Sequence, residues 1–271
     1  MHNAECLNGG LLLGASGGIG LQTVRTYAEH GAKVTAHYNT NISPLHDLVE
    51  AFGSASVRAI QADLTNESSV FHMFSQHEGQ PDFGPVQIVV INHGIWPTAD
   101  EPIAVMSLDR WNHIISTNLT SSFLVAREYL KQLSLAPEEL RAKANIVFIG
   151  STAGKYGEAG HADYAATKSA MMYGLTLSLK NEIVKIAPKG RVNCIAPGWV
   201  KTPMAEETLR DTAFVQRALA TTPLKKVAEA RDIANQIALI SSPTLSGHVS
   251  GQVLMVDGGM EGRLLNVPSD F

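Results

Sequence analysis

Cysteine is scarce in this chain, as are long apolar runs and any excess of one sign of charge. Two cysteines, Cys6 and Cys194, suit a reducing compartment rather than a disulfide framework. No apolar run approaches the roughly 18–20 residues of a membrane span, so we expect no membrane partner. The 21 basic and 25 acidic residues give a net charge of −4, which provides no basic footprint for nucleic acid. The ten histidines show no metal-binding spacing, and we expect no metal site.

The length and the apolar pattern predict a single domain over residues 1–271. A glycine motif lies within the first twenty residues, so we expect no cleavable signal before the fold and a cytoplasmic location. Apolar runs alternate with helical patterns, which favours an α/β fold: a Rossmann-type, doubly wound, seven-stranded parallel sheet with helices on both faces. The seven predicted strands are Leu11–Leu13, Val34–Tyr38, Val57–Gln61, Ile88–Asn92, Ile146–Gly150, Arg191–Ala196 and Val253–Val256. Cys194 falls inside one of them and is interpreted as a small buried residue.

The glycine motif is LLLGASGGIG, residues 11–20, and it stands between an apolar run and a helical stretch. In this strand–turn–helix context Gly14 permits the tight turn, Gly18 lets the backbone approach a pyrophosphate, and Gly20 allows close helix packing. The N-terminus of the following helix offers unpaired N–H groups to phosphates. The motif therefore predicts a dinucleotide site.

A second motif combines Tyr164, Lys168 four residues later, and Ser151 thirteen residues before the tyrosine. Residues 163–185 predict a helix, so the Tyr and Lys side chains share one face and the cation favours tyrosinate. Ser151 follows the apolar run 145–150 and is expected at the carboxyl end of a strand, where such sheets bind ligands. Alone, Tyr-x-x-x-Lys also fits an ordinary helix with its lysine in solvent. The glycine motif favours the catalytic interpretation.

Together these motifs make the chain resemble the single-domain short-chain dehydrogenase/reductase family, almost end to end from about Leu7 to Arg263. Further matches follow in order, at Asp63-Leu64, Asn92-His93-Gly94, Asn118, Pro197-Gly198 with Thr202, and the stretch VSGQVLMVDGG. The resemblance implies an NAD(P)(H)-dependent oxidoreductase that interconverts a ketone and a secondary alcohol, such as a carbonyl reductase. The rival is a protein of the same fold that binds nucleotide without net redox turnover, as a regulator or a repurposed cyclase, isomerase or dehydratase.

The resemblance also implies a role for each residue of a catalytic set. Tyr164 would be the general acid or base, and Lys168 would lower the pKa of Tyr164 and bind the nicotinamide ribose. Ser151 would hold the substrate oxygen. Asn118 would hold a water that connects Lys168 to solvent, although a buried Asn within a helix can also serve only to kink it.

Cofactor contacts implied by the resemblance lie on the glycine loop and on the turns after successive strands. NADP(H) is favoured over NAD(H), because Tyr38 stands where an NAD-preferring relative would carry an Asp, and Tyr38 does not repel a 2′-phosphate. Asn39, Thr40 and Asn41 can hydrogen-bond such a phosphate, but no arginine accompanies them. The contact residues are Gly14, Ser16, Gly17, Gly18, Ile19, Gly20, Tyr38, Asn39, Thr40, Asp63, Leu64, Asn92, His93, Gly94, Tyr164, Lys168, Pro197, Gly198, Val200 and Thr202.

The chain departs from the family pattern at three places. Leu13 replaces the usual Thr, which removes one hydrogen bond worth about 1 kcal/mol. His93 replaces the usual Ala and either titrates near substrate or, as we favour, packs as a hydrogen-bonded loop residue. His161 and Asp163 precede Tyr164 and raise the hypothesis of a proton relay.

The substrate is expected to be a small apolar or aromatic ketone or alcohol. A long excursion over residues 198–224 follows a strand and is interpreted as a substrate lid. Candidate pocket residues are Trp96, Ser151, Tyr156, Trp199, Met204 and Phe214, of which Met204 and Phe214 fit packing inside the lid equally well. The resemblance implies a homo-oligomer, a tetramer or a dimer, formed through helices around 112–131 and 164–185. The tail 260–271 retains Leu264 and Leu265 and is expected to dock on a neighbouring subunit.

Overall fold

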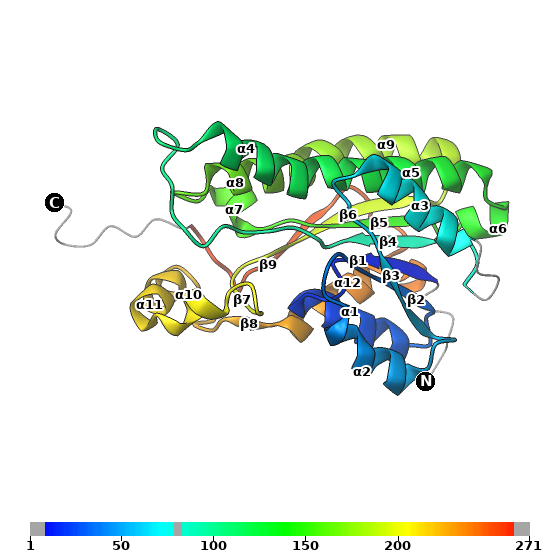
Figure 1. Ribbon diagram of the computed structural model, residues 1–271, viewed down its shortest axis with the longest axis horizontal. Helices are drawn as coiled ribbons and strands as arrows, with labels where there is room; N and C mark the ends of the chain where they lie inside the picture. The colour runs from blue at the N-terminus through cyan, green and yellow to red at the C-terminus, as the bar shows by residue number, and fades with distance from the viewer. Residues whose placement is uncertain (1–8, 79–82, 263–271) are drawn as a thin grey trace.

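The computed structural model describes residues 9–78 and 83–262, and its centre is a seven-stranded sheet (Figure 1). Every strand pairs in parallel with its neighbours, in the order β3-β2-β1-β4-β5-β6-β9. The strands are β1 (Gly10–Leu13), β2 (Val34–Tyr38), β3 (Val57–Gln61), β4 (Ile88–Ile91), β5 (Asn145–Ile149), β6 (Arg191–Pro197) and β9 (Val253–Val256). The predicted fold class is confirmed. The order reverses between β1 and β4, and a crevice opens at such a point at the carboxyl ends of the strands.

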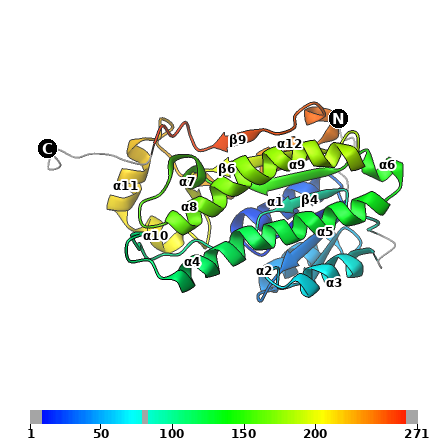
Figure 2. The same cartoon turned by 90° about the horizontal axis from the view of Figure 1, so that it is seen from above.

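Helices cover both faces of the sheet (Figures 1 and 2). On one face lie α1 (Gly18–Glu29), α2 (Ser43–Phe52) and α12 (Ala230–Ser241). On the other lie α3 (Glu67–Glu78), α5 (Ser121–Leu135) and α9 (Thr176–Ile186). Burial on both faces explains why the strands read as continuous apolar runs rather than as alternating ones.

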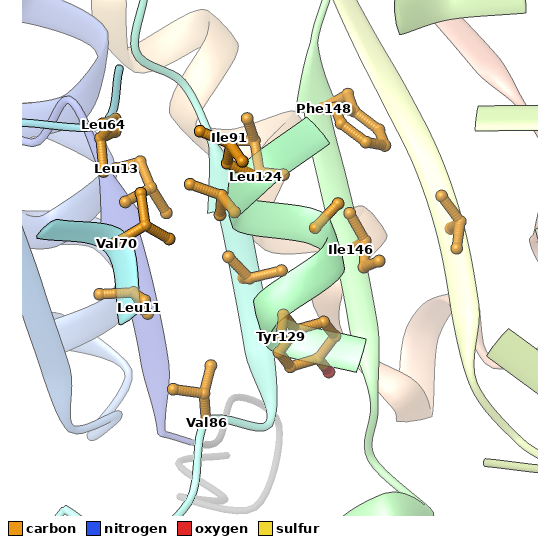
Figure 3. Packing of buried hydrophobic residues seen from close by; sticks show 14 of the residues in the cluster. Leu11, Leu13, Leu64, Val70, Val86, Ile91, Leu124, Tyr129, Ile146 and Phe148 are labelled. Carbon is orange, nitrogen blue, oxygen red and sulfur yellow. The ribbon is translucent and has the colours of Figure 1, made fainter. Parts of the chain in front are cut away.

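Two hydrophobic clusters fill the space between the sheet and its helices. In the cluster of Figure 3, Ile91 of β4 lies beside Leu124 of α5, and Ile146 and Phe148 of β5 belong to the same cluster as Tyr129 of α5. On the opposite face, Tyr27 of α1 is buried and its hydroxyl donates to Ser241 Oγ at 2.5 Å. These clusters fix the sheet edge from which the site is built.

Two long helical rods run side by side on one face, and each contains a π-helical segment (Figure 2). One rod is α4 (Leu108–Ile114), η1 (Ile115–Thr120) and α5; the other is α8 (Ala162–Ser169), η2 (Ala170–Leu175) and α9. The helix predicted over 163–185 is present, but the π segment within it was not predicted. Such segments insert an extra residue into a turn and often occur near functional sites.

The segment 198–224 is less irregular than the sequence indicated. It contains β7 (Val200–Lys201), α10 (Glu206–Arg210) and α11 (Thr212–Ala220), and β7 pairs with β8 (Ala228–Glu229) in a small second sheet. Its role as a lid stays a prediction. Three short helices complete the described chain: α6 (Glu138–Arg141), α7 (Thr152–Tyr156) and α13 (Pro243–Ser246).

Several sequence expectations concern residues outside the described ranges, namely Cys6, Leu7, Arg263 and the tail residues 263–271 with Leu264 and Leu265. Cys194 is buried in β6, as expected. Among the described residues, no helix combines the length and the apolarity that crossing a membrane requires. The described residues also contain no group of three or more His, Cys, Asp or Glu side chains placed to hold a metal ion.

Truncation of Phe148 tests the core described above. Phe148 is 0% exposed, so Phe148→Ala is expected to lower the free energy of unfolding by about 3–5 kcal/mol through lost burial and a residual cavity. Urea unfolding at one fixed protein concentration measures the change. Phe71, on α3, is 52% exposed and provides the control, since Phe71→Ala should stay within about 0.5 kcal/mol of the parent. Equal losses in the two variants would contradict the described packing.

Candidate active site

A cavity of about 430 Å³ lies at the carboxyl ends of the strands. It gathers residues that are far apart in the sequence, including Ser151, Tyr164 and Lys168 together with the glycine loop. The predicted residues that line it are Gly14, Ser16, Gly17, Gly18, Ile19, Asn39, Asp63, Leu64, Asn92, His93, Gly94, Trp96, Ser151, Tyr164, Lys168, Pro197, Gly198, Trp199, Val200, Thr202 and Met204. Most of the predicted cofactor and catalytic residues therefore share one cavity.

Some predicted residues do not line this cavity. Tyr156 donates its hydroxyl to the Met260 carbonyl at 2.6 Å, and Phe214 packs against Trp199 with ring centroids 4.9 Å apart. For Phe214, packing within the 198–224 segment was the alternative left open by the sequence, and this is the arrangement observed. The remaining predicted residues outside the lining are Gly20, Tyr38, Thr40 and Asn118.

The cavity also contains residues that the sequence analysis missed. His37 carried a signal, because it is a polar side chain inside the apolar run of β2. Glu158, in the loop after α7, carried none. Most of the others are chain neighbours of predicted residues; the full set is His37, Thr65, Ile95, Thr117, Ile149, Gly150, Thr152, Glu158, Pro203 and Ala205.

The glycine turn between β1 and α1 is shaped by close approach. Gly14 has φ +63°, in the region that favours glycine, and its N–H donates to His37 Nδ1 at 3.1 Å. A Cβ on Gly20 would lie 2.2 Å from the Gly14 carbonyl oxygen, so α1 begins directly against the turn. Because His37 Nδ1 accepts, Nε2 carries the proton and donates to the Ala62 carbonyl at 2.9 Å. Burial lowers the pKa of His37 to about 4, so this imidazole is neutral at pH 7.

The start of α1 and the residue His93 fit a bound dinucleotide. No side chain caps α1 at Gly17, which leaves its first N–H groups for an anion. His93 Nε2 lies 2.7 Å from Ser121 Oγ, and Ser121 Oγ donates to the Thr117 carbonyl, so Nε2 is the donor to Ser121. His93 Nδ1 is then a buried acceptor without a partner in the described residues. Such an acceptor matches a sugar hydroxyl, and burial, with smaller effects from His37 and Lys168, lowers the pKa of His93 to about 3.

Lys168 is buried beside Tyr164 in this cavity. It is 4% exposed, its Nζ donates to the Ile149 carbonyl at 2.8 Å, and Nζ lies 5.6 Å from the Tyr164 ring centroid. Burial lowers the pKa of Lys168 to about 8. Ser151 stands just after β5, where its Oγ accepts from the Ala153 N–H at 3.1 Å and caps α7.

Asn118 connects the loop after β4 to this centre. It is fully buried in η1, and its amide both accepts from the Ile95 N–H at 2.8 Å and donates to the Ile95 carbonyl at 2.9 Å. A Cβ on Gly94 would lie 3.1 Å from Asn118 Oδ1 and 3.7 Å from Lys168 Nζ. Both polar atoms of the Asn118 side chain are thus bonded to the backbone of Ile95, and Asn118 lies within the π-helical segment. Water holding by Asn118 stays a prediction.

Trp96 and Trp199 contribute aromatic surface to the lining of the cavity. Trp96 stacks on His161 with ring centroids 4.8 Å apart and an interplanar angle of 12°. Trp199 meets Trp96 edge to face at 5.8 Å, and Phe214 meets Trp199 in the same way. His161 Nε2 lies 2.7 Å from the Pro97 carbonyl, so His161 contacts both the Trp96 ring and the backbone next to it.

Comparison with known proteins gives the same picture along almost the whole chain. The family described as "Enoyl-(Acyl carrier protein) reductase" matches residues 14–261. The 3-oxoacyl-[acyl-carrier-protein] reductase FabG of Escherichia coli is 33% identical over 255 residues, which cover 92% of this chain and 96% of that protein. FabG of Staphylococcus epidermidis is 32% identical over 254 residues, which cover 92% of this chain and 97% of that protein.

A solved structure shares the fold as well. It is described as a short-chain dehydrogenase/reductase SDR:Glucose/ribitol dehydrogenase from Brucella melitensis. The two superpose with a TM-score of 0.80 at 30% identity, and the match covers 92% of this chain and 95% of that chain.

Replacement of Lys168 by Met tests the burial of the ammonium through the pH dependence of stability. The folded-state pKa of about 8 lies below the usual 10.5, so the parent folds at a cost below pH 8, and that cost disappears as the pH rises to 10.5. Lys168→Met lacks this titration. We expect the free energy of unfolding of the variant to exceed that of the parent by the largest amount at pH 7. This difference should shrink between pH 8 and 10.5. Urea unfolding of both proteins across this range measures it, and a constant difference would show that Lys168 does not titrate low.

Proposed function

The chain belongs to the short-chain dehydrogenase/reductase family, and from that premise we propose that it is an NADP(H)-dependent oxidoreductase that interconverts a ketone and a secondary alcohol. One observation carries the proposal: Ser151, Tyr164 and the buried Lys168 line the same cavity as the glycine loop at the start of α1. This arrangement places a hydroxyl donor, a phenol and a cation beside a dinucleotide site. The reaction is transfer of a hydride to the carbonyl carbon and of a proton to the carbonyl oxygen, or the reverse.

The chain's own residues would hold the cofactor at identifiable places. The N–H groups at the start of α1 would bind the pyrophosphate, and His93 Nδ1 would accept from a ribose hydroxyl. Thr202 also lies against the glycine loop, since a Cβ on Gly18 would lie 2.9 Å from Thr202 Cγ2. When bound, the nicotinamide supplies or receives the hydride.

Proton transfer is assigned to Tyr164. In the reducing direction its phenol gives a proton to the oxygen that becomes the alcohol, and Ser151 Oγ donates a hydrogen bond to the same oxygen. Lys168 stabilises the resulting phenolate by its positive charge. Because Lys168 Nζ is buried and bonded to the Ile149 carbonyl, the charge stays in one position through the reaction.

The preference for NADP(H) rests on the end of β2. Tyr38 provides no carboxylate to repel a 2′-phosphate, and Asn39 lines the cavity next to it. His37, also in the lining, is neutral and adds no negative charge. Among the acidic residues of the lining, Asp63 is the nearest to Tyr38 in sequence. Its Oδ1 accepts from the Thr65 N–H at 2.9 Å and from the Thr65 hydroxyl at 2.7 Å, so its carboxylate is bonded within the turn after β3.

The substrate we propose is a free apolar or aromatic ketone. Trp96, Trp199 and Met204 give the cavity its large apolar surfaces. Within the described lining, Lys168 is the one Lys or Arg side chain, and it is buried. The cavity therefore offers no exposed cation to the phosphate of a carrier-linked thioester, the substrate class that the names of the relatives indicate.

A homo-oligomer remains our expectation, and Phe123 and Leu177, on the two rods, expose 45% and 38% of their surface.

Turnover with a panel of ketones tests the reaction and the acid together. We expect NADPH oxidation in the wild type, a loss of about 10²–10⁴-fold in kcat for Tyr164→Phe, and about 10²-fold for Ser151→Ala. Nicotinamide absorbance is the readout, and binding of NADPH to Tyr164→Phe is the control for folding. A folded protein that binds NADPH but turns over no ketone or alcohol would favour the non-redox alternative.

Cofactor choice is tested by placing a carboxylate at the end of β2. Tyr38→Asp is expected to shift the ratio of NADPH to NADH affinity toward NADH by on the order of tenfold, about 1.4 kcal/mol, through repulsion of the 2′-phosphate. Tyr38→Asn is the matched control, since the Asn side chain has the same size as that of Asp but carries no charge. A wild type that binds NADH more tightly than NADPH would overturn the assignment.

A further inference from the structure

Arg110 joins the loop after β4 to the segment just before the predicted catalytic tyrosine. Its guanidinium donates to the carbonyls of Ala99 at 2.8 Å and Gly160 at 3.0 Å. It also donates to the carboxylates of Glu101 at 3.1 Å and Asp163 at 2.9 Å. One side chain thus bonds two segments that are distant in sequence. The Glu101 N–H reinforces the junction by donating to the Gly160 carbonyl at 2.9 Å.

Asp163 is the member of this junction that touches Tyr164. Its side chain is 0% exposed, with Oδ2 on Arg110 and Oδ1 accepting from the Tyr164 N–H at 2.8 Å. It lies in the first turn of α8, where the helix dipole also favours a negative charge. A carboxylate buried this deeply requires a cation, and Arg110, 14% exposed, provides it.

The other charged or titratable groups around the pair are few among the described residues. Glu101 accepts from Arg110 and is 28% exposed, while Asp100 is 82% exposed and lies 3.4 Å from His161 Nδ1. Lys168 Nζ lies 5.6 Å from the centroid of the Tyr164 ring. Arg110 is therefore the direct partner of the Asp163 carboxylate.

From this geometry we propose that Arg110 and Asp163 form a positioning pair for Tyr164, which fixes the start of α8 against the loop that carries Trp96 and neutralises the buried carboxylate that accepts from the Tyr164 backbone N–H. The proposal rests on the proposed function for the role of Tyr164. Neither residue contacts the cavity, so both act through Tyr164.

The charge balance of the pair predicts shifts of opposite sign in the two single variants. Arg110→Met leaves the Asp163 carboxylate uncompensated, which favours the protonated phenol. Alcohol oxidation needs the phenolate, so the rise of activity with pH should shift to higher pH in this variant, by about half a unit to one unit. Asp163→Asn keeps an oxygen for the Tyr164 N–H but leaves Arg110 without its full partner, and its profile should move to lower pH. The double variant should return toward the parent.

The experiment compares the parent, both single variants and the double variant in two measurements. The first is kcat/KM for alcohol oxidation against pH, with NADPH affinity recorded separately, because the pair lies outside the cofactor contacts. The second is the tyrosinate absorbance of each protein against pH without substrate, from which the titration of a matched protein carrying Tyr164→Phe is subtracted. Arg127→Met is the control, because it breaks a surface ion pair with Glu67 between α5 and α3.

Opposite shifts in the single variants and their cancellation in the double variant, with NADPH affinity within about twofold of the parent, support the proposal. Equal shifts in Arg127→Met, unchanged profiles, or a double variant no closer to the parent than either single variant overturn it. Arg110→Gln, which removes the charge but keeps hydrogen-bond donors, replaces Arg110→Met if that variant does not fold. If even the parent turns over no substrate, the proposed function fails, and the absorbance titration still decides whether the pair controls Tyr164.

Discussion

The hydrogen bond from the Lys168 ammonium to the Ile149 carbonyl is the interaction around which this site is organised. It ties the last turn of α8 to the end of β5, so the helix that carries Tyr164 and the strand that precedes Ser151 have one fixed relation. Burial makes the ammonium costly and lowers its pKa, and the hydrogen bond to the Ile149 carbonyl offsets part of that cost. A solvent-exposed lysine at the same spacing would leave the phenol without a fixed charge.

Around that bond, the surrounding elements hold their loops by side-chain to backbone hydrogen bonds. Asn118 holds Ile95 by both amide atoms, and Arg110 holds Ala99 and Gly160. His161 contacts the Pro97 carbonyl and supports Trp96. Each of these contacts satisfies polar backbone groups of a loop that has no strand or helix partner of its own. The part of the cavity that Trp96 lines is consequently built from loops that are fixed at several points.

The sequence predicted the sheet and most of the cavity for clear physical reasons. Strands buried on both faces are continuous apolar runs, and the glycines of the turn are required by φ at Gly14 and by contact at Gly20. It could not predict pairings that depend on the assembled fold, such as Arg110 with Asp163 or β7 with β8. Position in the sequence also does not fix the direction of a side chain, which is why Tyr156 was predicted to line the cavity but lies outside it, and why the sequence left the place of Phe214 open.

The π-helical segments η1 and η2 constrain how this chain can change its length. Each extra residue offsets the rest of its rod by about 100°, the rotation per residue of an α-helix. Deletion of one residue from η2 would restore regular α-helix but turn α9 by that angle, so that Ile183 would leave the sheet while Lys168 stayed in place. A deletion anywhere between Lys168 and Ile183 has the same effect, so the number of residues between Lys168 and the core residues that follow it is constrained as well as their identity.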